Sequence, residues 1–306
     1  MPDQPVPTIN AATRYCAVYG HPVRHSASPA MHNAALAHLG LNWRYVACDV
    51  DPAQLAPAIR GAQAMGFVGL NLTVPHKILA LDMVDFVDPA ARRWGAVNTI
   101  RFEGRTGDGD WLPLALFNDG NPPQTRSAGF NTDADAIIRA IREDLGLELK
   151  GRRVLILGAG GAGRAAALRI ADEQPAGMVL INRTRAKAEA LAGEIRKAQP
   201  GIKLDTDYPD DTSDLVLNAT SLGLKLRDPL PINDDWLRAH PPAHAYDMIY
   251  RPAETPFLKA ARELGARTAN GLGMLLHQGA DALEIWTGQV APREKMRLAL
   301  ERFLKG

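Results

Sequence analysis

Residues 154–163 read VLILGAGGAG, and this stretch decides the fold of the chain. Four apolar residues that are typical of a buried strand run directly into Gly-x-Gly-x-x-Gly, and a helical pattern, 162–171, follows. In such a motif the first glycine permits a tight turn, the second lets backbone N–H groups approach a pyrophosphate, and the third lets the helix pack close to the strand. The positive end of the helix dipole also attracts phosphate. The stretch predicts a dinucleotide site made by Gly158, Ala159, Gly160, Gly161, Ala162 and Gly163.

The next strand, expected at Gly177–Ile181, bears on the choice of cofactor. It is followed by Asn182, Arg183 and Thr184, about 20 residues beyond the glycines, where an NAD enzyme usually carries Asp or Glu for the ribose 2′-hydroxyl. Arg183 can instead form a fork onto a 2′-phosphate, with Thr184, Arg185 and Lys187 nearby. Alternatively, these cations are a solvated start of the helix expected at 185–199, although cations there oppose the helix dipole. The sequence therefore favours NADP over NAD.

Length and composition indicate an ordinary globular protein with a small-molecule ligand. The chain has 306 residues, enough for two domains, and 35 Lys and Arg against 34 Asp and Glu leave a formal charge of +1. This balance gives no electrostatic case for nucleic acid or membrane partners. Cys16 and Cys48 are its two cysteines, and without Cys-x-x-Cys or His-Glu-x-x-His we expect no disulfide framework, no metal site and a reducing, cytoplasmic setting. We expect a loose polar tail at 1–13 and no membrane-spanning segment.

The order of the remaining elements predicts an α/β protein. Strands are expected at 15–19, 43–48 and 69–72, helices at 29–39 and 54–65, and helical turns through Trp94, which is the βαβ order of a mainly parallel sheet. After residue 133 we expect helices at 134–145, 256–264 and 272–286 and strands at 215–217 and 245–247. Between the last two strands, Leu226–Pro242 is expected to be a surface loop with one short helix near Trp236.

Polar residues gather where these strands end, the edge at which open α/β sheets bind ligands. Ser28 is expected to cap the first helix, with Pro29 at its first turn, whereas Ser26 has no such structural task. The 69–77 segment presents Asn71, Thr73 and Lys77 from one loop. Each of these could be an ordinary loop residue, since a single lysine is usually only solvated. Two further polar groups stand at element ends, Asn98 and Asp133, the latter a plausible helix cap.

From Tyr15 almost to its C-terminus, the chain resembles the shikimate dehydrogenase family. Several separate motifs, which occur in the same order as in that family, carry the resemblance. GHPVRHSASP (20–29) resembles the substrate-carboxylate loop of that family, NLTVPHK (71–77) its catalytic-lysine motif, GAVNT (95–99) the segment of a substrate-binding Asn, and NTD (131–133) that of the catalytic Asp. NATS (218–221), YDMIY (246–250) and GLGMLLHQ (271–278) complete the resemblance. It implies catalytic roles for Lys77 and Asp133, substrate contacts for Ser26, Ser28, Asn98, Tyr250 and Gln278, and NADP contacts for Asn182, Arg183, Thr184, Met248 and Gly271. By their place in the same loops, Asn71 and Thr73 are further candidates for substrate contacts, and Lys187 for an NADP contact.

The resemblance also implies the architecture and the reaction. We expect a substrate domain from residues 14–133 and 274–306, and a Rossmann NADP-binding domain at 134–273. The implied reaction is the reversible reduction of 3-dehydroshikimate by NADPH, with Lys77 as acid and base and Asp133 as its partner. Two alternatives stay open, a quinate or quinate/shikimate dehydrogenase that uses NAD or NADP, and a catalytically idle homologue that senses a metabolite. A homodimer is possible.

One segment departs from the family pattern. Between Thr99 and Asn131 the family has a short hairpin, whereas this chain has the longer Gly- and Pro-rich segment Glu103–Ser127. Its content of Gly, Pro and Asp suits turns, so we expect a surface elaboration that could be shortened without unfolding the protein.

Overall fold

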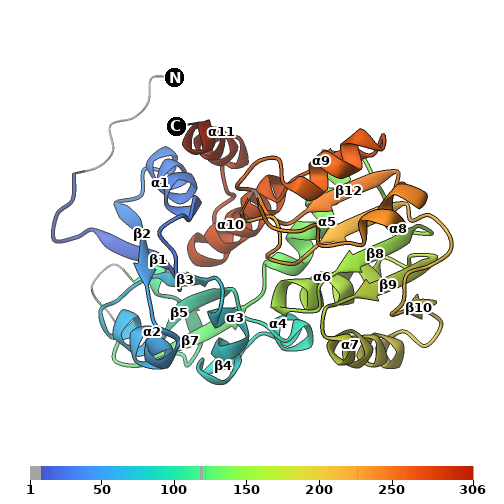
Figure 1. The fold of residues 1–306 in the computed structure, drawn as a ribbon. Coiled ribbons are helices and arrows are strands. Elements are labelled where there is room, and N and C mark those ends of the chain that lie inside the picture. The colour runs from blue at the N-terminus through green and yellow to red at the C-terminus, as the bar shows by residue number, and fades with distance from the viewer. Residues whose placement is uncertain (1–7, 118–119, 121, 226, 306) are drawn as a thin grey trace. The chain divides into compact units, whose positions relative to one another are not determined.

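The computed structural model describes residues 8–117, 120, 122–225 and 227–305, which form two compact units (Figure 1). Unit 1 comprises the described residues up to Thr132 together with those from Leu276 onward, and unit 2 is Asp133–Leu275. Each unit has a sheet of its own covered by helices. The α/β class predicted from the order of the elements is confirmed. Of the expected tail, residues 1–7 lie outside the described residues.

The sheet of unit 1 has the order β2-β1-β3-β5-β7-β4, with β6 paired to β5. Its strands are β1 (Arg14–Gly20), β2 (Trp43–Asp49), β3 (Gly69–Leu72), β4 (Phe86–Val87), β5 (Thr99–Arg105), β6 (Trp111–Pro113) and β7 (Thr125–Phe130). β1 pairs in parallel with β2 and β3, and β4 with β7, whereas β5 is antiparallel to β3, β6 and β7. The sheet is therefore mixed, because β5 runs antiparallel to each of the three strands with which it pairs.

The helices of unit 1 are α1 (Ser28–His38), α2 (Leu55–Ala64), α3 (His76–Leu79), α4 (Pro89–Trp94), α10 (Leu272–Thr287), whose first residues belong to unit 2, and α11 (Arg293–Lys305). Single 3₁₀ turns lie at Pro52–Gln54, Ala80–Asp82 and Leu114–Leu116. α10 packs closely on α1, since a side chain at Gly279 would collide with Met31. Gln278 is thereby fixed beside a helix contact in unit 1.

Unit 2 has the all-parallel order β10-β9-β8-β11-β12-β13. Its strands are β8 (Arg153–Leu157), β9 (Gly177–Ile181), β10 (Leu204–Asp205), β11 (Leu215–Asn218), β12 (His244–Asp247) and β13 (Arg267–Ala269), and its helices are α5 (Asp133–Leu145), α6 (Gly161–Asp172), α7 (Arg185–Ala198), α8 (Asp234–Ala239) and α9 (Pro256–Glu263). Counted along the chain this is the Rossmann order 3-2-1-4-5-6, whose direction reverses between β8 and β11. The short helix expected near Trp236 is α8, while Leu226 lies outside the described residues.

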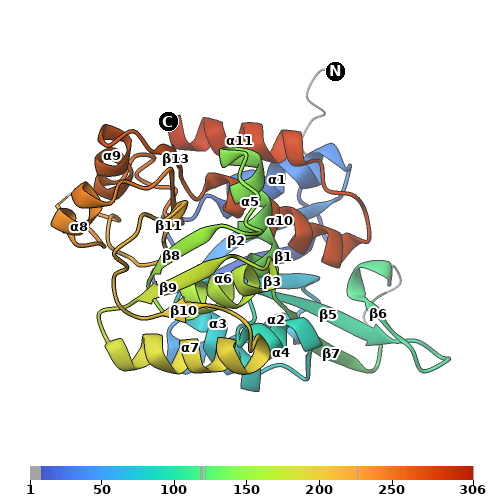
Figure 2. The same cartoon turned by 90° about the vertical axis from the view of Figure 1, so that its right-hand side faces the viewer.

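The expectation for Glu103–Ser127 is partly wrong. Both ends of the segment belong to the antiparallel ribbon that Figure 2 shows extending through β5, β6 and β7. In its middle, Leu114 is 0% exposed and joins the apolar core of unit 1 with Leu70 and Phe102. Shortening the segment would therefore open that core. The composition correctly indicated an exposed turn between β5 and β6, since residues 107, 108 and 110 are exposed. Residues 118, 119 and 121 of the segment lie outside the described residues.

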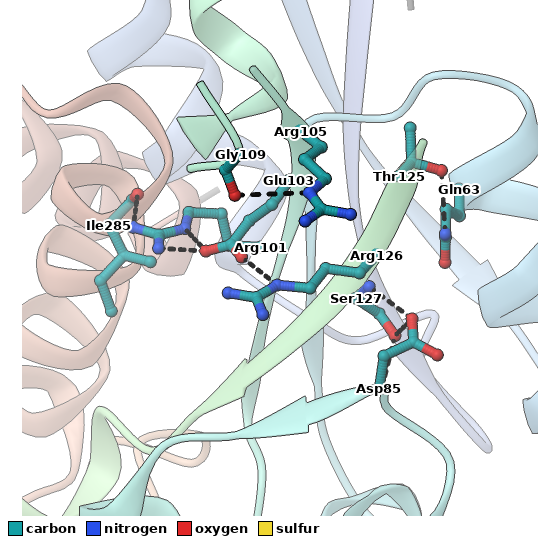
Figure 3. Close-up of polar contacts among 10 residues, drawn as sticks. All are labelled: Gln63, Asp85, Arg101, Glu103, Arg105, Gly109, Thr125, Arg126, Ser127 and Ile285. Carbon is teal, nitrogen blue, oxygen red and sulfur yellow. Dashed lines mark hydrogen bonds and ion pairs between the residues drawn. The ribbon is translucent and has the colours of Figure 1, made fainter. Parts of the chain in front are cut away.

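The ribbon also buries a charge cluster (Figure 3). Glu103, 1% exposed, accepts from Arg101 Nε at 2.9 Å and from Arg126 Nε at 2.6 Å. The Arg101 guanidinium lies over Phe130, and that of Arg126 lies over the Trp111 ring at 4.5 Å from its centroid. One buried carboxylate thus joins two strands whose arginines are also packed on aromatic rings.

His32 on α1 makes the stability of the protein depend on acid pH. Its ring is 0% exposed, its two nitrogens have no partner among the described residues, and it stacks on Tyr45 with 4.2 Å between ring centroids. Burial lowers the pKa of His32 to about 3. The unfolded chain, with a histidine pKa of about 6.5, therefore takes up a proton first as pH falls, and stability is lost from about pH 6.5 downward.

We expect His32→Phe to remove this component while keeping the ring stack. At pH 4.5 the lost stability in the native chain is about 2–3 kcal/mol. The measurement is urea unfolding of both proteins at pH 7 and at pH 4.5. If the two proteins lose the same stability between these pH values, His32 is not the acid-sensitive group.

Candidate active site

In unit 1 the ends of β1 and β3 bring two predicted ligand loops together. These strands are parallel neighbours, and a side chain at Gly20 would collide with the methyl group of Thr73. The His21 N–H donates to the Val74 carbonyl at 3.1 Å. The loop that carries Ser26 and Ser28 therefore lies against the loop that carries Thr73 and Lys77. Glycine at position 20 permits this approach.

Asn71 and Asn98 lie in one buried polar network behind these loops. Asn71 Nδ2 donates to Thr99 Oγ1 at 3.1 Å and to the Asn98 carbonyl at 3.3 Å. Asn98 Nδ2 donates to Thr132 Oγ1 at 2.9 Å, and the Thr132 N–H donates back to Asn98 Oδ1 at 2.8 Å. Because each buried group has partners, the amides are held in fixed orientations at the sheet edge.

Tyr45 on β2 connects this network with the serine loop, and the sequence reasoning missed it. Its hydroxyl donates to Asn71 Oδ1 at 2.8 Å, and a side-chain hydrogen bond joins it to Ser28. Burial raises the pKa of Tyr45 well above its usual range, so the hydroxyl stays protonated. In the sequence Tyr45 is simply one aromatic residue of a buried strand. Only the pairing of β2 with β1 indicates that its hydroxyl faces polar partners.

The prediction that Ser28 caps α1 is wrong. Ala27 is the N-cap residue and no side chain caps the helix, while Ser28 is the first helical residue and is buried. The Ser28 N–H donates to Ser26 Oγ at 3.3 Å. Ser28 is therefore oriented by Tyr45 and Ser26 instead of by the end of the helix, and it has no capping role to explain its presence.

The remaining predicted catalytic and substrate residues are placed by their elements. Lys77 is in α3, and its carbonyl accepts from the Val97 N–H at 2.8 Å, which ties the lysine turn to the segment before Asn98. Lys77 and Gln278 belong to unit 1. Asp133, which begins α5 as a first-turn acid, and Tyr250, after β12, belong to unit 2.

In unit 2 the glycine motif has the geometry of a phosphate-binding turn. Gly158 has a φ of +105° and lies against the Ala219 carbonyl, while a side chain at Gly163 would collide with the Gly158 carbonyl. At Gly160, by contrast, a side chain would meet nothing within 4 Å. Gly160 is the N-cap of α6, and no side chain caps the helix. The turn is tight where strand and helix meet and open at the helix N-terminus, the place at which Rossmann folds in general bind a pyrophosphate.

Asn182 fixes the second nucleotide loop to the first. Its Oδ1 accepts from the Ala159 N–H at 3.0 Å, and its Nδ2 donates to the Thr184 carbonyl at 2.9 Å. Arg185 is already engaged, since its guanidinium pairs with Asp207 at 2.7 and 2.8 Å and with Glu189 at 2.8 Å. The neighbouring cations, Arg183 and Lys187, are not engaged in this way by any described residue.

The side chains of Arg183 and Lys187 are exposed and have no ion-pair or hydrogen-bond partner in the part of the chain that the structure describes. Thr184 is the N-cap of α7, yet its hydroxyl accepts no capping hydrogen bond. These three residues are therefore available to an anion at the start of α7.

Met248 and Gly271 lie against one another. A side chain at Gly271 would collide with the Met248 carbonyl, and the Met248 N–H donates to the Asn218 carbonyl at 3.0 Å. Both residues therefore sit next to the end of β11, at the point where the strand order reverses.

Two kinds of feature are absent from the described ranges. No three His, Cys, Asp or Glu side chains there are grouped so that they could hold a metal ion. Nor does any helix within those ranges have the length and apolar character needed to cross a membrane.

Family models match most of this framework. Residues 18–100 match the shikimate dehydrogenase substrate binding domain, and residues 140–223 match shikimate / quinate 5-dehydrogenase. Residues 271–301 match the shikimate 5′-dehydrogenase C-terminal domain. The chain belongs to the shikimate dehydrogenase family. The resemblance predicted from the separated motifs is thereby confirmed, as is an N-terminal substrate domain followed by a Rossmann domain.

Individual relatives agree with this assignment. The chain is 42% identical over 296 residues to a shikimate dehydrogenase (NADP(+)) of Moorella thermoacetica, which covers 93% of this chain and 91% of that protein. The crystal structure of shikimate 5-dehydrogenase from Thermus thermophilus, in complex with NADP(H) and shikimate, has a TM-score of 0.78 and 36% identity, over 95% of this chain and 100% of that one. A ligand-free 5-ketofructose reductase of a Gluconobacter strain has a TM-score of 0.76 and 32% identity, over 96% and 99%. The shikimate dehydrogenases among these relatives are oxidoreductases that act on a CH–OH group.

Proposed function

We propose that this chain is an NADP-dependent shikimate dehydrogenase, which reversibly reduces 3-dehydroshikimate to shikimate in aromatic amino-acid (chorismate) biosynthesis. The observation that carries the proposal is the meeting of the serine loop and the lysine loop at the ends of β1 and β3, in a chain of this family. A carboxylate and hydroxyls of one small molecule can be held by neutral donors there, with an ammonium beside them. Unit 1 would bind the substrate and unit 2 the cofactor.

The chemistry needs a hydride for C3 and a proton for its oxygen. When bound, NADPH supplies the hydride from nicotinamide C4. The Lys77 ammonium donates the proton as negative charge develops on the oxygen, and in the reverse direction its neutral amine accepts the hydroxyl proton. Asp133 holds and tunes Lys77. Substrate orientation falls to hydrogen-bonding side chains, namely Ser26, Ser28, Asn71, Thr73, Asn98, Tyr250 and Gln278. Since these are neutral, selectivity rests on matched hydrogen bonds more than on charge attraction.

The residues of unit 2 fit NADP. The pyrophosphate would bind the backbone of residues 158–163, because the turn is open at Gly160 and the N-terminus of α6 lacks a side-chain cap. The 2′-phosphate would bind Arg183, Thr184 and Lys187, with Asn182 aligning their loop. The nicotinamide would lie near Met248 and Gly271.

Steady-state kinetics with shikimate and quinate, each with NADP and NAD, tests the proposal against its alternatives. We expect the highest kcat/KM for shikimate with NADP. Higher kcat/KM for quinate would favour a quinate dehydrogenase, and no turnover would favour a sensing homologue. NADPH oxidation with 5-ketofructose belongs in the same series, because a protein of this fold is named for that substrate. A preference for 5-ketofructose would contradict the proposal.

Arg183→Ala is expected to weaken NADP binding by about 10- to 100-fold, because it removes a charge-assisted contact worth about 1.5–3 kcal/mol. NAD binding should change little. Arg185→Ala is the matched control, since its guanidinium is held by Asp207 and Glu189. The measurement is the Kd of each cofactor by fluorescence titration. Equal losses for NADP and NAD would return Arg183 to a structural role.

The setting of the protein is part of the same proposal. Cys16 and Cys48 are unpaired thiols, which supports a reducing, cytoplasmic location. Small molecules are the proposed ligands, without nucleic acid or membrane partners. A homodimer stays a prediction, which light scattering of the purified protein would test.

A further inference from the structure

Asp247, the last residue of β12, carries a buried carboxylate that the proposed chemistry does not use. It is 0% exposed. Its Oδ1 accepts from the Ile249 N–H at 3.0 Å and from Asn218 Nδ2 at 3.1 Å, and its Oδ2 accepts from Thr255 Oγ1 at 2.6 Å. Among the described residues it forms no ion pair with Lys, Arg or His. Burial raises the pKa of Asp247, while its hydrogen bonds oppose that shift.

The partners of Asp247 belong to three separate segments. Asn218 ends β11, and its Oδ1 accepts from both the N–H and the hydroxyl of Thr220, at 3.0 and 2.7 Å. Thr255 is the N-cap of α9 and accepts from the Leu258 N–H at 3.3 Å. Ile249 lies in the loop after β12. One carboxylate therefore joins a strand end, a helix start and a loop.

That loop holds residues expected at the nicotinamide and the substrate. The Met248 N–H donates to the Asn218 carbonyl at 3.0 Å, and the Gly271 N–H donates to the Ile249 carbonyl at 3.1 Å. The Met248 carbonyl lies against Gly271. With the bond from Ile249 to Asp247, the loop is fixed on both sides, and Tyr250 follows directly.

The carboxylate of Asp247 is not explained by stability, because burying a charge without a cation beside it destabilises a protein. A neutral side chain of the same shape would cost less. The carboxylate differs from an amide in being acceptor-only, so it can face three donors at once without a donor of its own to place. This property suits the precise orientation of a loop more than it suits stability.

We propose that Asp247 is a positioning residue, whose carboxylate sets the Met248–Tyr250 loop and thereby the placement of the nicotinamide for hydride transfer. The inference rests on the proposed function for its turnover readout. The adenosine half of the cofactor would be held elsewhere, by the glycine turn and Arg183. The two halves can therefore be tested separately.

The test compares Asp247→Asn and Asp247→Ala with the parent chain, using NADP, 2′,5′-ADP and shikimate as probes. 2′,5′-ADP carries the adenosine and 2′-phosphate but no nicotinamide. We expect kcat to fall about 10- to 100-fold, the primary deuterium isotope effect on kcat to rise, and NADP affinity to fall. The Kd of 2′,5′-ADP should stay within about twofold, and Asp247→Asn should retain more activity than Asp247→Ala because its amide oxygen still accepts at Oδ1.

Asp228→Asn is the matched control. Asp228 in the same unit also accepts several hydrogen bonds, since its Oδ2 accepts from the N–H groups of Gly223 at 3.1 Å and Lys225 at 3.0 Å. It should leave kcat and both affinities unchanged. If Asp247→Ala does not fold, Thr255→Val, which removes one donor to Asp247, provides the second test and should raise the isotope effect.

Two results would overturn the inference. The first is that folded Asp247 variants keep the kcat and the NADP affinity of the parent chain. The second is that the affinities for NADP and for 2′,5′-ADP fall equally, which would indicate a purely structural role. Failure of the proposed function looks different. If the parent chain does not oxidise shikimate but the Asp247 variants still lose affinity for NADP and keep it for 2′,5′-ADP, the positioning role stands and the substrate assignment falls.

Discussion

Lys77→Ala is expected to lower kcat for shikimate oxidation by about 10²–10⁴-fold, while KM for shikimate stays within a few-fold. Positioned proton transfer contributes a factor of this size, and the ammonium matters most when charge builds on the substrate oxygen. A lysine that only binds substrate would instead raise KM and preserve kcat. The measurement is steady-state kinetics with shikimate and NADP, with kcat and KM determined separately for the parent and the variant.

Asp133→Asn should lower kcat as well. If the two residues act as one unit, the double variant should cost less than the product of the single effects. Lys77→Met is a useful companion, because it keeps most of the side-chain volume and removes the charge. A Lys77→Ala protein with the parent kcat would take the lysine out of the chemistry and move the acid–base role to Asp133, Tyr250 or water.

Glu103→Ala is expected to lower the free energy of unfolding by about 3–5 kcal/mol. The substitution removes a buried carboxylate and leaves Arg101 and Arg126, which are both bonded to it, beside each other without a counter-charge (Figure 3). Arg101 and Arg126 are on the neighbouring strands β5 and β7, so the ribbon loses the group that joins them. Urea unfolding monitored by tryptophan fluorescence measures the effect.

Asp49→Ala is the control for exposure. The His21–Asp49 pair in the same unit has a short separation of 2.6 Å, but its side chains are 49% and 38% exposed, whereas that of Glu103 is 1% exposed. An exposed pair contributes about 0–1 kcal/mol, so this variant should remain close to the parent stability. Similar losses for Glu103→Ala and Asp49→Ala would mean that burial does not decide the strength of the Glu103 cluster.

The sequence predicts best those features that depend on residues close to one another along the chain. β3 and β9 begin and end at the residues expected, and the other strands and helices that we expected differ by a residue or two at their ends. A short run of apolar residues between turn-forming residues favours a strand whatever its tertiary neighbours are. In the same way, the glycine motif favours a tight turn on its own. The family, the reaction class and the preference for NADP follow from motifs of the same kind.

The errors arose where a residue acts through a distant partner. Ser28 looked like a helix cap, yet it hydrogen-bonds to Tyr45 of β2. The segment Glu103–Ser127 looked like a surface loop because its composition suits turns. Its burial instead depends on the antiparallel pairing of β5 with β7 and on the core that receives Leu114.

By itself, then, the sequence determined the Rossmann turn at 158–163, the strands and helices that we expected at 15–72 and beyond residue 133, and which polar residues stand at strand ends. The tertiary structure alone decided the partners of the buried polar side chains: Tyr45 with Asn71, Glu103 with two arginines, and Asp247 with three donors. The physical reason is that backbone preferences are local, whereas a buried polar side chain is satisfied by whichever strand or helix becomes its neighbour.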